Sequence, residues 1–334
     1  MSVAVDPVRA IADAVLYEGY VLWPYRRSAL KNAQRWTFGG VYPRAHSEGR
    51  AAGDDPWTMQ TEVLVEGGPQ TRVSLGVRFL HVVWRQMVDA EGREVDEILA
   101  CGEKHLTWEE AVEREVTVAP VALEELAGGL EVSISVPAGR DEEPLSEAGA
   151  GAVVRTWEGL EGSLRVSAVE VSPGLYRLNS VIGNRTPWSE GTREKVMRRT
   201  FCSTHTVLRA KEGAFVSLTD PPAALVEAAE ACENTGTWPV LVGEAGDRHT
   251  LLSSPIILED HPRIAPESPG DLFDGGEIDQ MLYLNILQLT DEEKAEARAS
   301  DPRVREVLDR SESLSAEEMM RLHGRTVREL QVRG

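Results

Sequence analysis

The middle of the chain alternates between apolar and polar residues, which is the pattern of β-strands that bury one face. In residues 130–136, leucine, valine and isoleucine occupy every second position. Comparable runs predict further strands, over 61–65, 71–79, 164–171, 175–182, 195–209, 214–218, 238–242 and 251–258. Short segments rich in glycine or proline separate 61–65 from 71–79 and 164–171 from 175–182. We therefore expect these two pairs of strands to form hairpins.

Helical signals lie mainly towards the two ends of the chain. Asp6 and Pro7 form a typical helix start, and the apolar residues after them share one face, which predicts a helix over 6–18. Further short helices are predicted over 27–35, 220–232, 278–289, 291–299, 304–310 and 316–322. Two of these begin with the spacing of a capping box, Thr290 with Glu293 and Ser315 with Glu318. Residues 107–118 combine a helix-like start with a strand-like end.

The order of these elements predicts the fold class. Because strands follow one another without intervening helices, we expect an α+β fold of mostly antiparallel sheets, in two β-rich halves. Residues 137–151 hold few apolar side chains and predict either a domain linker or a long loop. The expected units are an N-terminal helix with an aromatic and basic segment, two β-rich units, and a final acidic loop with C-terminal helices, over 1–47, 58–136, 152–258 and 259–334.

Charge and composition limit the classes of partner. The chain of 334 residues has a formal net charge of −20, whereas binding to nucleic-acid phosphates needs a basic surface, so we expect no nucleic-acid partner. No run of about 18 apolar residues occurs, so we expect no membrane span. The N-terminal residues lack the features of a secretory signal, and the three cysteines have long spacings that suit a reducing compartment. These features predict a cytoplasmic protein.

A basic and aromatic segment, residues 17–44, contrasts with the rest of this acidic chain. It holds seven aromatic and five arginine or lysine residues, and no acid lies between Glu18 and Glu48. Tyrosine, tryptophan and arginine anchor many interfaces, because they bury a large area and keep a polar group. The residues that we expect to contact a partner are Tyr20, Trp23, Tyr25, Arg26, Arg27, Arg35, Trp36 and Tyr42. The alternative is that the aromatic residues close the hydrophobic core.

Motifs of several enzyme classes are absent, namely the phosphate loops GxGxxG and GxxxxGKS/T, the GxSxG elbow and the HExxH zinc helix. A first candidate metal site combines Cys101 and His105 with Cys202 and His205. Two sulfurs and two imidazoles would satisfy tetrahedral zinc. A regular strand, however, would place Cys202 and His205 on opposite faces, and buried cysteines commonly serve as small apolar residues.

A second candidate metal site is the acidic loop over 267–279. Asp271 and Asp274 could offer oxygen ligands to calcium or magnesium, although the spacing is not that of an EF-hand. The same acids also suit the positive N-terminus of the helix predicted after them, where Asp274 would be the cap. The loop could equally contact a basic patch on this chain or on a partner.

Three stretches, over 16–44, 253–282 and 289–324, resemble an uncharacterised bacterial family, notably from actinobacteria, that is encoded beside nickel–iron hydrogenase genes. The resemblance implies a role near hydrogenase assembly or function, with hydrogenase subunits or maturation factors as partners. It brings no catalytic residues. The chain also lacks the cysteine quartet that holds an iron–sulfur cluster.

These observations lead to the hypothesis of a non-catalytic accessory or assembly protein that binds a protein partner and needs no cofactor. The partner implied by the resemblance is a nickel–iron hydrogenase component. The alternative hypothesis is a metal-dependent enzyme whose ligands come from the two cysteines and two histidines, or from the acidic loop.

Overall fold

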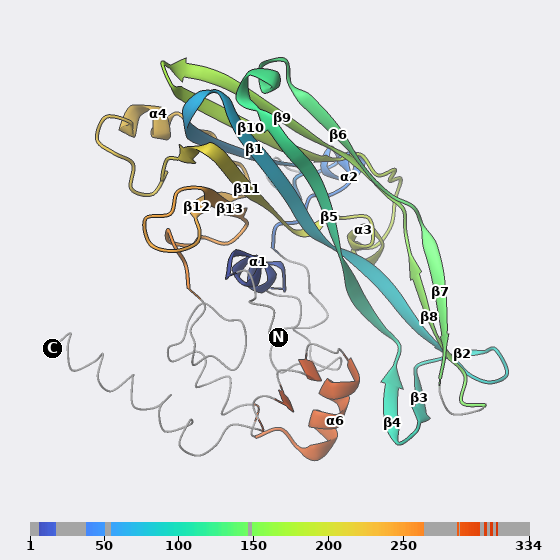
Figure 1. The fold of residues 1–334 in the computed structure, drawn as a ribbon. Helices are drawn as coiled ribbons and strands as arrows, with labels where there is room; N and C mark the ends of the chain where they lie inside the picture. The colour runs from blue at the N-terminus through green and yellow to red at the C-terminus, as the bar shows by residue number, and fades with distance from the viewer. Residues whose placement is uncertain are drawn as a thin grey trace.

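The computed structural model describes residues 7–17, 38–50, 55–145, 149–263, 286, 288–300, 304–305, 308–309 and 312. Within these residues all strand pairs are antiparallel and the helices are short (Figure 1). The expected α+β class with mostly antiparallel sheet is therefore confirmed, with β-structure dominant. Strands from both β-rich stretches of the sequence join one sheet.

In the described part of the chain, eleven strands form the main sheet and two form a separate hairpin. The main sheet comprises β1 (Thr58–Val88), β2 (Glu94–Val95), β5 (Trp108–Ala122), β6 (Leu130–Val136), β7 (Gly139–Pro144), β8 (Ala152–Trp157), β9 (Leu160–Ser172), β10 (Leu175–Asn184), β11 (Cys202–Phe215), β12 (Trp238–Leu241) and β13 (Thr250–Ser254). The hairpin comprises β3 (Glu97–Ala100) and β4 (Glu103–Leu106). The helices are α1 (Pro7–Tyr17), α2 (Arg44–Ser47), the 3₁₀ helix η2 (Leu123–Gly128), α3 (Arg193–Met197), α4 (Val226–Glu230) and α6 (Asp291–Ser300).

Strand β1 organises the sheet, because its 31 residues pair with a succession of partners. Along one edge it pairs first with β10 and then with β5, and along the other edge first with β11 and then with β8. The sheet continues beyond β10 through β9 to β6, and beyond β11 through β13 to β12. Figure 1 shows β1 running through the full length of this curved sheet.

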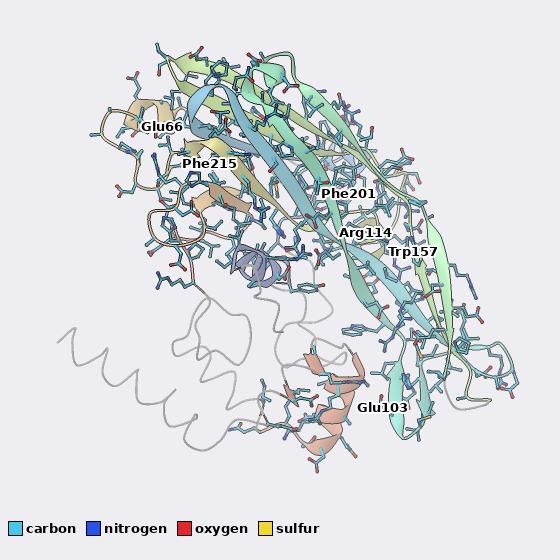
Figure 2. All side chains as sticks on the ribbon, in the orientation of Figure 1. Glu66, Glu103, Arg114, Trp157, Phe201 and Phe215 are labelled. Atoms are coloured by element: carbon cyan, nitrogen blue, oxygen red, sulfur yellow. The ribbon has the colours of Figure 1, made fainter. Side chains whose placement is uncertain are left out.

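The largest hydrophobic core lies on one face of β1. Val73 and Phe79 contribute to it from β1, and Leu126 of η2 and Leu164 of β9 pack against them. The ring of Phe79 stacks on that of Phe201, with 4.6 Å between the centroids. Figure 2 labels Phe201 and, at the end of β11, the equally buried Phe215.

Helix α1 covers the opposite face of the sheet. Ile11 and Val15 pack against β11, β12 and β13. Between helix and sheet, the buried guanidinium of Arg78 pairs with Asp13 of α1 and, at 2.6 Å, with Glu113 of β5. A buried guanidinium is tolerated only when it is paired, so this ion pair fixes α1 over β1 and β5.

The expected hairpin of 61–65 with 71–79 is wrong, because both runs belong to the single strand β1. At the glycine-rich segment between them, the chain does not reverse direction. Strand β1 pairs with β10 before this segment and with β11 and β5 after it. Thr71 Oγ1 donates a hydrogen bond of 2.8 Å to the carbonyl of Glu212 there. A Cβ atom on Gly213 would lie 2.5 Å from the Thr71 Cγ2 atom, so the close approach of the two strands depends on glycine.

Residues 107–118 form strand rather than helix, apart from Thr107 just before β5. The Thr107 hydroxyl accepts the Met87 N–H at 3.0 Å and donates to the Val95 carbonyl at 2.8 Å. This side chain therefore joins neighbouring strands and does not cap a helix.

Two other expectations require correction. The start of the strand expected over 195–209 is the helix α3, which lets the adjacent residues Val196 and Met197 enter the same hydrophobic cluster. In a strand, adjacent side chains would point to opposite faces. The segment 137–151 contains strand β7, which pairs with β8 although its side chains are almost all exposed.

Several local predictions are confirmed. Strands β9 and β10 form the expected hairpin, with Gly174 at a φ of 76° in its turn. Helix α1 and strand β12 occur where expected, whereas β13 and α4 each occupy only part of the expected range. The capping box before α6 is complete: Thr290 N–H donates to Glu293 Oε2 at 2.9 Å, and Glu293 N–H donates to Thr290 Oγ1 at 3.2 Å.

The helices expected over 27–35 and 316–322 lie outside the described residues, as does most of those over 278–289 and 304–310. No helix in the described ranges has both the length and the apolar composition needed to cross a membrane.

Candidate functional site

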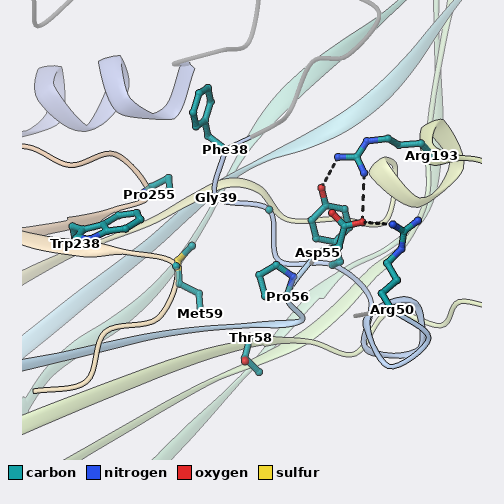
Figure 3. A pocket seen from close by; sticks show the side chains of 13 residues that line it. Phe38, Gly39, Arg50, Asp55, Pro56, Thr58, Met59, Arg193, Trp238 and Pro255 are labelled. Carbon is teal, nitrogen blue, oxygen red and sulfur yellow. Dashed lines mark hydrogen bonds and ion pairs between the residues drawn. The ribbon is translucent and has the colours of Figure 1, made fainter. Parts of the chain in front are cut away.

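A pocket of about 440 Å³ lies where the end of the aromatic and basic segment meets the start of β1, the start of α3 and the start of β12 (Figure 3). One part of its wall is apolar and another part is charged. Its lining residues are Phe38, Gly39, Gly40, Tyr42, Arg50, Asp55, Pro56, Thr58, Met59, Arg193, Gly236, Trp238 and Pro255.

The segment 38–42 reaches the pocket because its backbone is bonded to the residues that begin β11. Val41 exchanges two hydrogen bonds with Phe201, of 2.9 and 3.1 Å. The carbonyls of Phe38 and Gly39 accept hydrogen bonds from the backbone N–H groups of Ser203 and Thr204. Four backbone bonds thus hold this segment like a short additional strand.

Two glycines allow this segment to pack closely. Gly39 has a φ of 56°, and a Cβ atom there would lie 2.5 Å from the Pro255 ring. A Cβ atom on Gly40 would lie 2.7 Å from the Tyr42 ring. Larger residues at either position would therefore push apart the walls of the pocket.

Phe38 and Trp238 line the apolar part of the pocket together with Met59 and Pro255 (Figure 3). Each of the two aromatic side chains is 44% exposed. Trp238 is held in place because the loop before β12 is bonded to β1, where Thr235 and Gln60 exchange backbone hydrogen bonds of 3.1 and 2.9 Å.

Asp55 is the centre of the charged part. Its Oδ2 atom lies 3.0 Å from His46 Nε2, 3.4 Å from Arg193 Nη1 and 3.5 Å from Arg50 Nη1. Arg193 donates a further hydrogen bond of 2.9 Å from Nη2 to the Tyr42 hydroxyl (Figure 3). One carboxylate oxygen therefore forms hydrogen bonds with His46 and Arg193 and an ion pair with Arg50.

Helices α2 and α3 supply His46 and Arg193, whereas Arg50 follows the end of α2. Arg193 is the first residue of α3, and the buried residues at the other end of this helix belong to the same hydrophobic cluster as Tyr42. His46 lies on α2, where its ring stacks on Tyr42 with 5.6 Å between centroids and meets the Trp188 ring edge-on at 5.8 Å. The site is thus fixed by aromatic packing.

The ionisation of the site follows from burial and charge. Burial by itself raises the pKa of Asp55, but the hydrogen bond with His46 and the charge of Arg193 outweigh it, so that the pKa lies below its usual value. Burial, and then the charge of Asp55, raise the pKa of Tyr42, so its phenol is neutral near pH 7. Two guanidinium charges against one carboxylate leave a formal charge of +1, before any charge on His46.

Tyr42 is the described member of the residues expected to contact a partner. Its side chain is only 4% exposed and belongs to a core cluster, while its hydroxyl bonds Arg193 at the pocket. It therefore helps to close the core, as the alternative interpretation of the aromatic segment expected. The other expected contact residues lie outside the described residues: Tyr20, Trp23, Tyr25, Arg26, Arg27, Arg35 and Trp36.

The residues of the first candidate metal site lie in different surroundings. Cys101 is exposed at the turn between β3 and β4, and His105 lies on β4, whereas Cys202 and His205 are fully buried on β11. In the described ranges, no group of three or more histidine, cysteine, aspartate or glutamate side chains is arranged to hold a metal ion. Asp271 and Asp274 of the acidic loop are not among the described residues.

Cys202 and His205 lie on the same face of β11, and the expectation of opposite faces is wrong. His205 pairs with Arg78 and Cys202 with Leu80, so three steps along β11 match two along β1. Ser203, at a φ of 50°, lies within this bulge. Burial raises the pKa of the Cys202 thiol and lowers that of His205 to about 3, so both side chains are neutral near pH 7.

Sequence reasoning missed the main residues of the pocket. Arg193 belongs to a basic run, but its partner Asp55, which also pairs with Arg50, is about 140 positions earlier, and only the fold brings them together. Trp238 was expected in a strand, without a role in binding. Comparison of the chain with protein-family models and with curated proteins found no match, so the interpretation of the pocket rests on its own geometry.

Proposed function

We propose that this chain is a non-catalytic accessory protein that binds a protein partner, and that the pocket is its docking site. The observation that carries the proposal is the pair of half-exposed aromatic side chains, Phe38 and Trp238, beside a pocket that also presents two arginines. Tryptophan and arginine are the residues that most often dominate the energy of protein interfaces.

Preorganisation supports binding. Four backbone hydrogen bonds between the segment of Phe38 and the start of β11 fix the backbone position of Phe38. The loop that is bonded to β1 does the same for Trp238. Side chains that are already held in place lose little further freedom on association, so more of the gain from burying them remains as affinity.

The titratable groups of the pocket also support binding rather than proton transfer. A general acid or base works best with a pKa near the operating pH. The pKa of Asp55 is lowered and that of Tyr42 is raised, so both pKa values are shifted further from pH 7. Asp55 is hydrogen-bonded to His46, and the Tyr42 hydroxyl accepts a hydrogen bond from Arg193. These bonds hold the wall of the pocket.

The resemblance of the chain to a family encoded beside nickel–iron hydrogenase genes supplies the partner to test first. We propose a hydrogenase subunit or a maturation factor in that role, and an accessory or assembly role for this chain.

The proposal is tested with a Phe38→Ala and Trp238→Ala double variant, whose binding to each purified hydrogenase component is measured by biolayer interferometry. We expect binding at least ~30-fold weaker than that of the wild type, equivalent to about 2 kcal/mol, because two central aromatic contacts are lost. A matched control, Leu99→Ala with Val169→Ala, removes exposed apolar side chains from β3 and β9 and should bind like the wild type. Equal binding by the double variant, or no binding of any component by the wild type, would contradict the proposal.

A further inference from the structure

We propose that the pocket recognises a carboxylate that lies next to an apolar side chain on the partner's docking segment. This inference rests on the proposed function and specifies the chemistry of the partner at the same site. Its basis is the combination of incompletely neutralised arginines with an adjacent apolar wall.

The two arginines of the pocket are paired with a single carboxylate, that of Asp55. Arg50 and Arg193 are 47% and 46% exposed in their side chains, and both approach a single oxygen of Asp55, at 3.5 and 3.4 Å. Asp55 is itself only 13% exposed, so it lies beneath them. Elsewhere in this acidic protein a single arginine often contacts two acids, as Arg78 does with Asp13 and Glu113.

The geometry leaves hydrogen-bond donors for a ligand. A guanidinium group carries five N–H donors in a planar fork that suits a carboxylate. Arg193 directs one donor group to Asp55 and one to the Tyr42 hydroxyl, and Arg50 directs one to Asp55. Within the described ranges these are the side-chain hydrogen bonds and ion pairs of the two arginines, and because both side chains are about half exposed, further N–H groups remain for a ligand.

The apolar wall indicates what the carboxylate is attached to. Phe38, Trp238 and Met59 line the same pocket as the two arginines (Figure 3). A volume of about 440 Å³ lies within the range of pockets that enclose small ligands or a few side chains. A segment with a carboxylate beside an aromatic or aliphatic group would therefore satisfy both parts at once.

The inference is tested on the full chain with N-acetyl-L-phenylalanine as probe and its amide as the neutral analogue. Ligand-observed NMR should give binding of the amide at least tenfold weaker than that of the acid. Arg193→Met and Arg50→Met should each lower the ratio of acid affinity to amide affinity severalfold. The matched control is Arg165→Met, which removes the same charge from an exposed position on β9.

Equal binding of acid and amide would overturn the inference, as would a preference for the acid that persists in an Arg50→Met and Arg193→Met double variant. Displacement of the acid by an equal concentration of inorganic phosphate would also overturn it, because it would indicate a general anion site. Circular dichroism of each variant confirms that it is folded, and Arg193→Lys, which keeps the charge but not the fork, should bind the acid with intermediate strength.

This test separates the inference from the proposed function. If a hydrogenase component binds through Phe38 and Trp238 but is unaffected by the arginine variants, the carboxylate inference is wrong and the docking function stands. If the acid binds as expected and no component binds, the chemistry of the pocket stands and the proposed partner is wrong.

Discussion

Two buried histidines link the stability of this protein to pH. Burial, and then the charge of Arg114, lower the pKa of His81 to about 4. Burial together with the charge of Arg78 lowers the pKa of His205 to about 3. Both rings lie in the central strands β1 and β11, where they have no exposed surface.

These two histidines predict a loss of stability in mild acid. In the unfolded chain a histidine binds a proton below about pH 6.5, whereas the folded protein resists protonation until a lower pH. The unfolded state therefore binds more protons between about pH 6.5 and pH 4, so stability falls as the pH falls through that window. Each histidine should contribute up to about 1.4 kcal/mol per pH unit.

Urea unfolding at a series of pH values between 7 and 4.5 measures this slope. His81→Gln and His205→Gln should each make the slope shallower, whatever they do to the stability at pH 7. His249→Gln, which changes a side chain that is 65% exposed, is the matched control. The same slope in both buried variants as in the wild type would contradict the prediction.

At the scale of elements, the pairing of β1 with β11 shifts register between Gly67 and Arg72, where the two strands pack closely. Thr71, only 2% exposed, is fixed there by its hydrogen bond to Glu212, and Gly213 packs directly against it. A side chain at Gly213 would also approach the Glu66 carbonyl to within 2.8 Å, so backbone would have to move.

Gly213→Ala should therefore lower the free energy of unfolding by about 2–3 kcal/mol, through overpacking in a region that cannot relax. Gly68→Ala is the matched control, because a Cβ atom there meets no other atom within 4 Å. Chemical denaturation of both variants provides the comparison. A Gly213→Ala variant as stable as Gly68→Ala would show that the strands can separate at this point without cost.

This pairing also shows how much of the fold could be predicted from the sequence. Several signals that act within a few residues mark real elements, namely the capping box at Thr290, the turn at Gly174 and the helix start before α1, whereas the helix-like start at Thr107 does not. The glycine-rich segment of β1 looks like a turn locally, but β10, β11 and β5 each pair with part of the strand and keep it extended. Pairing over more than a hundred residues is not encoded in a local pattern.

At the scale of the whole molecule, the pocket is a small positive site on an acidic protein. The chain carries a formal charge of −20, whereas Arg50, Arg193 and Asp55 together leave +1 at the pocket. A partner with a broadly acidic surface would be repelled at long range. The partner that fits best has a single carboxylate in an otherwise apolar docking segment.

The sequence predicted only part of this site. The aromatic and basic composition of residues 17–44 singled out a segment whose last part lines the pocket through Phe38, Gly39 and Tyr42. It could not reveal Asp55, Arg193 or Trp238, because α2, α3 and β12 are brought together by long-range contacts around the sheet. The pocket therefore became apparent only from the fold.

The most direct test of the docking function is site-specific photo-crosslinking with purified hydrogenase components. A photoreactive benzoylphenylalanine is introduced at Trp238 in one sample and at Val169, which is 62% exposed on β9, in another. We predict that a hydrogenase component is crosslinked from position 238 and not from position 169, and that excess unmodified chain suppresses the product. No product from position 238, or equal products from both positions, would contradict the account.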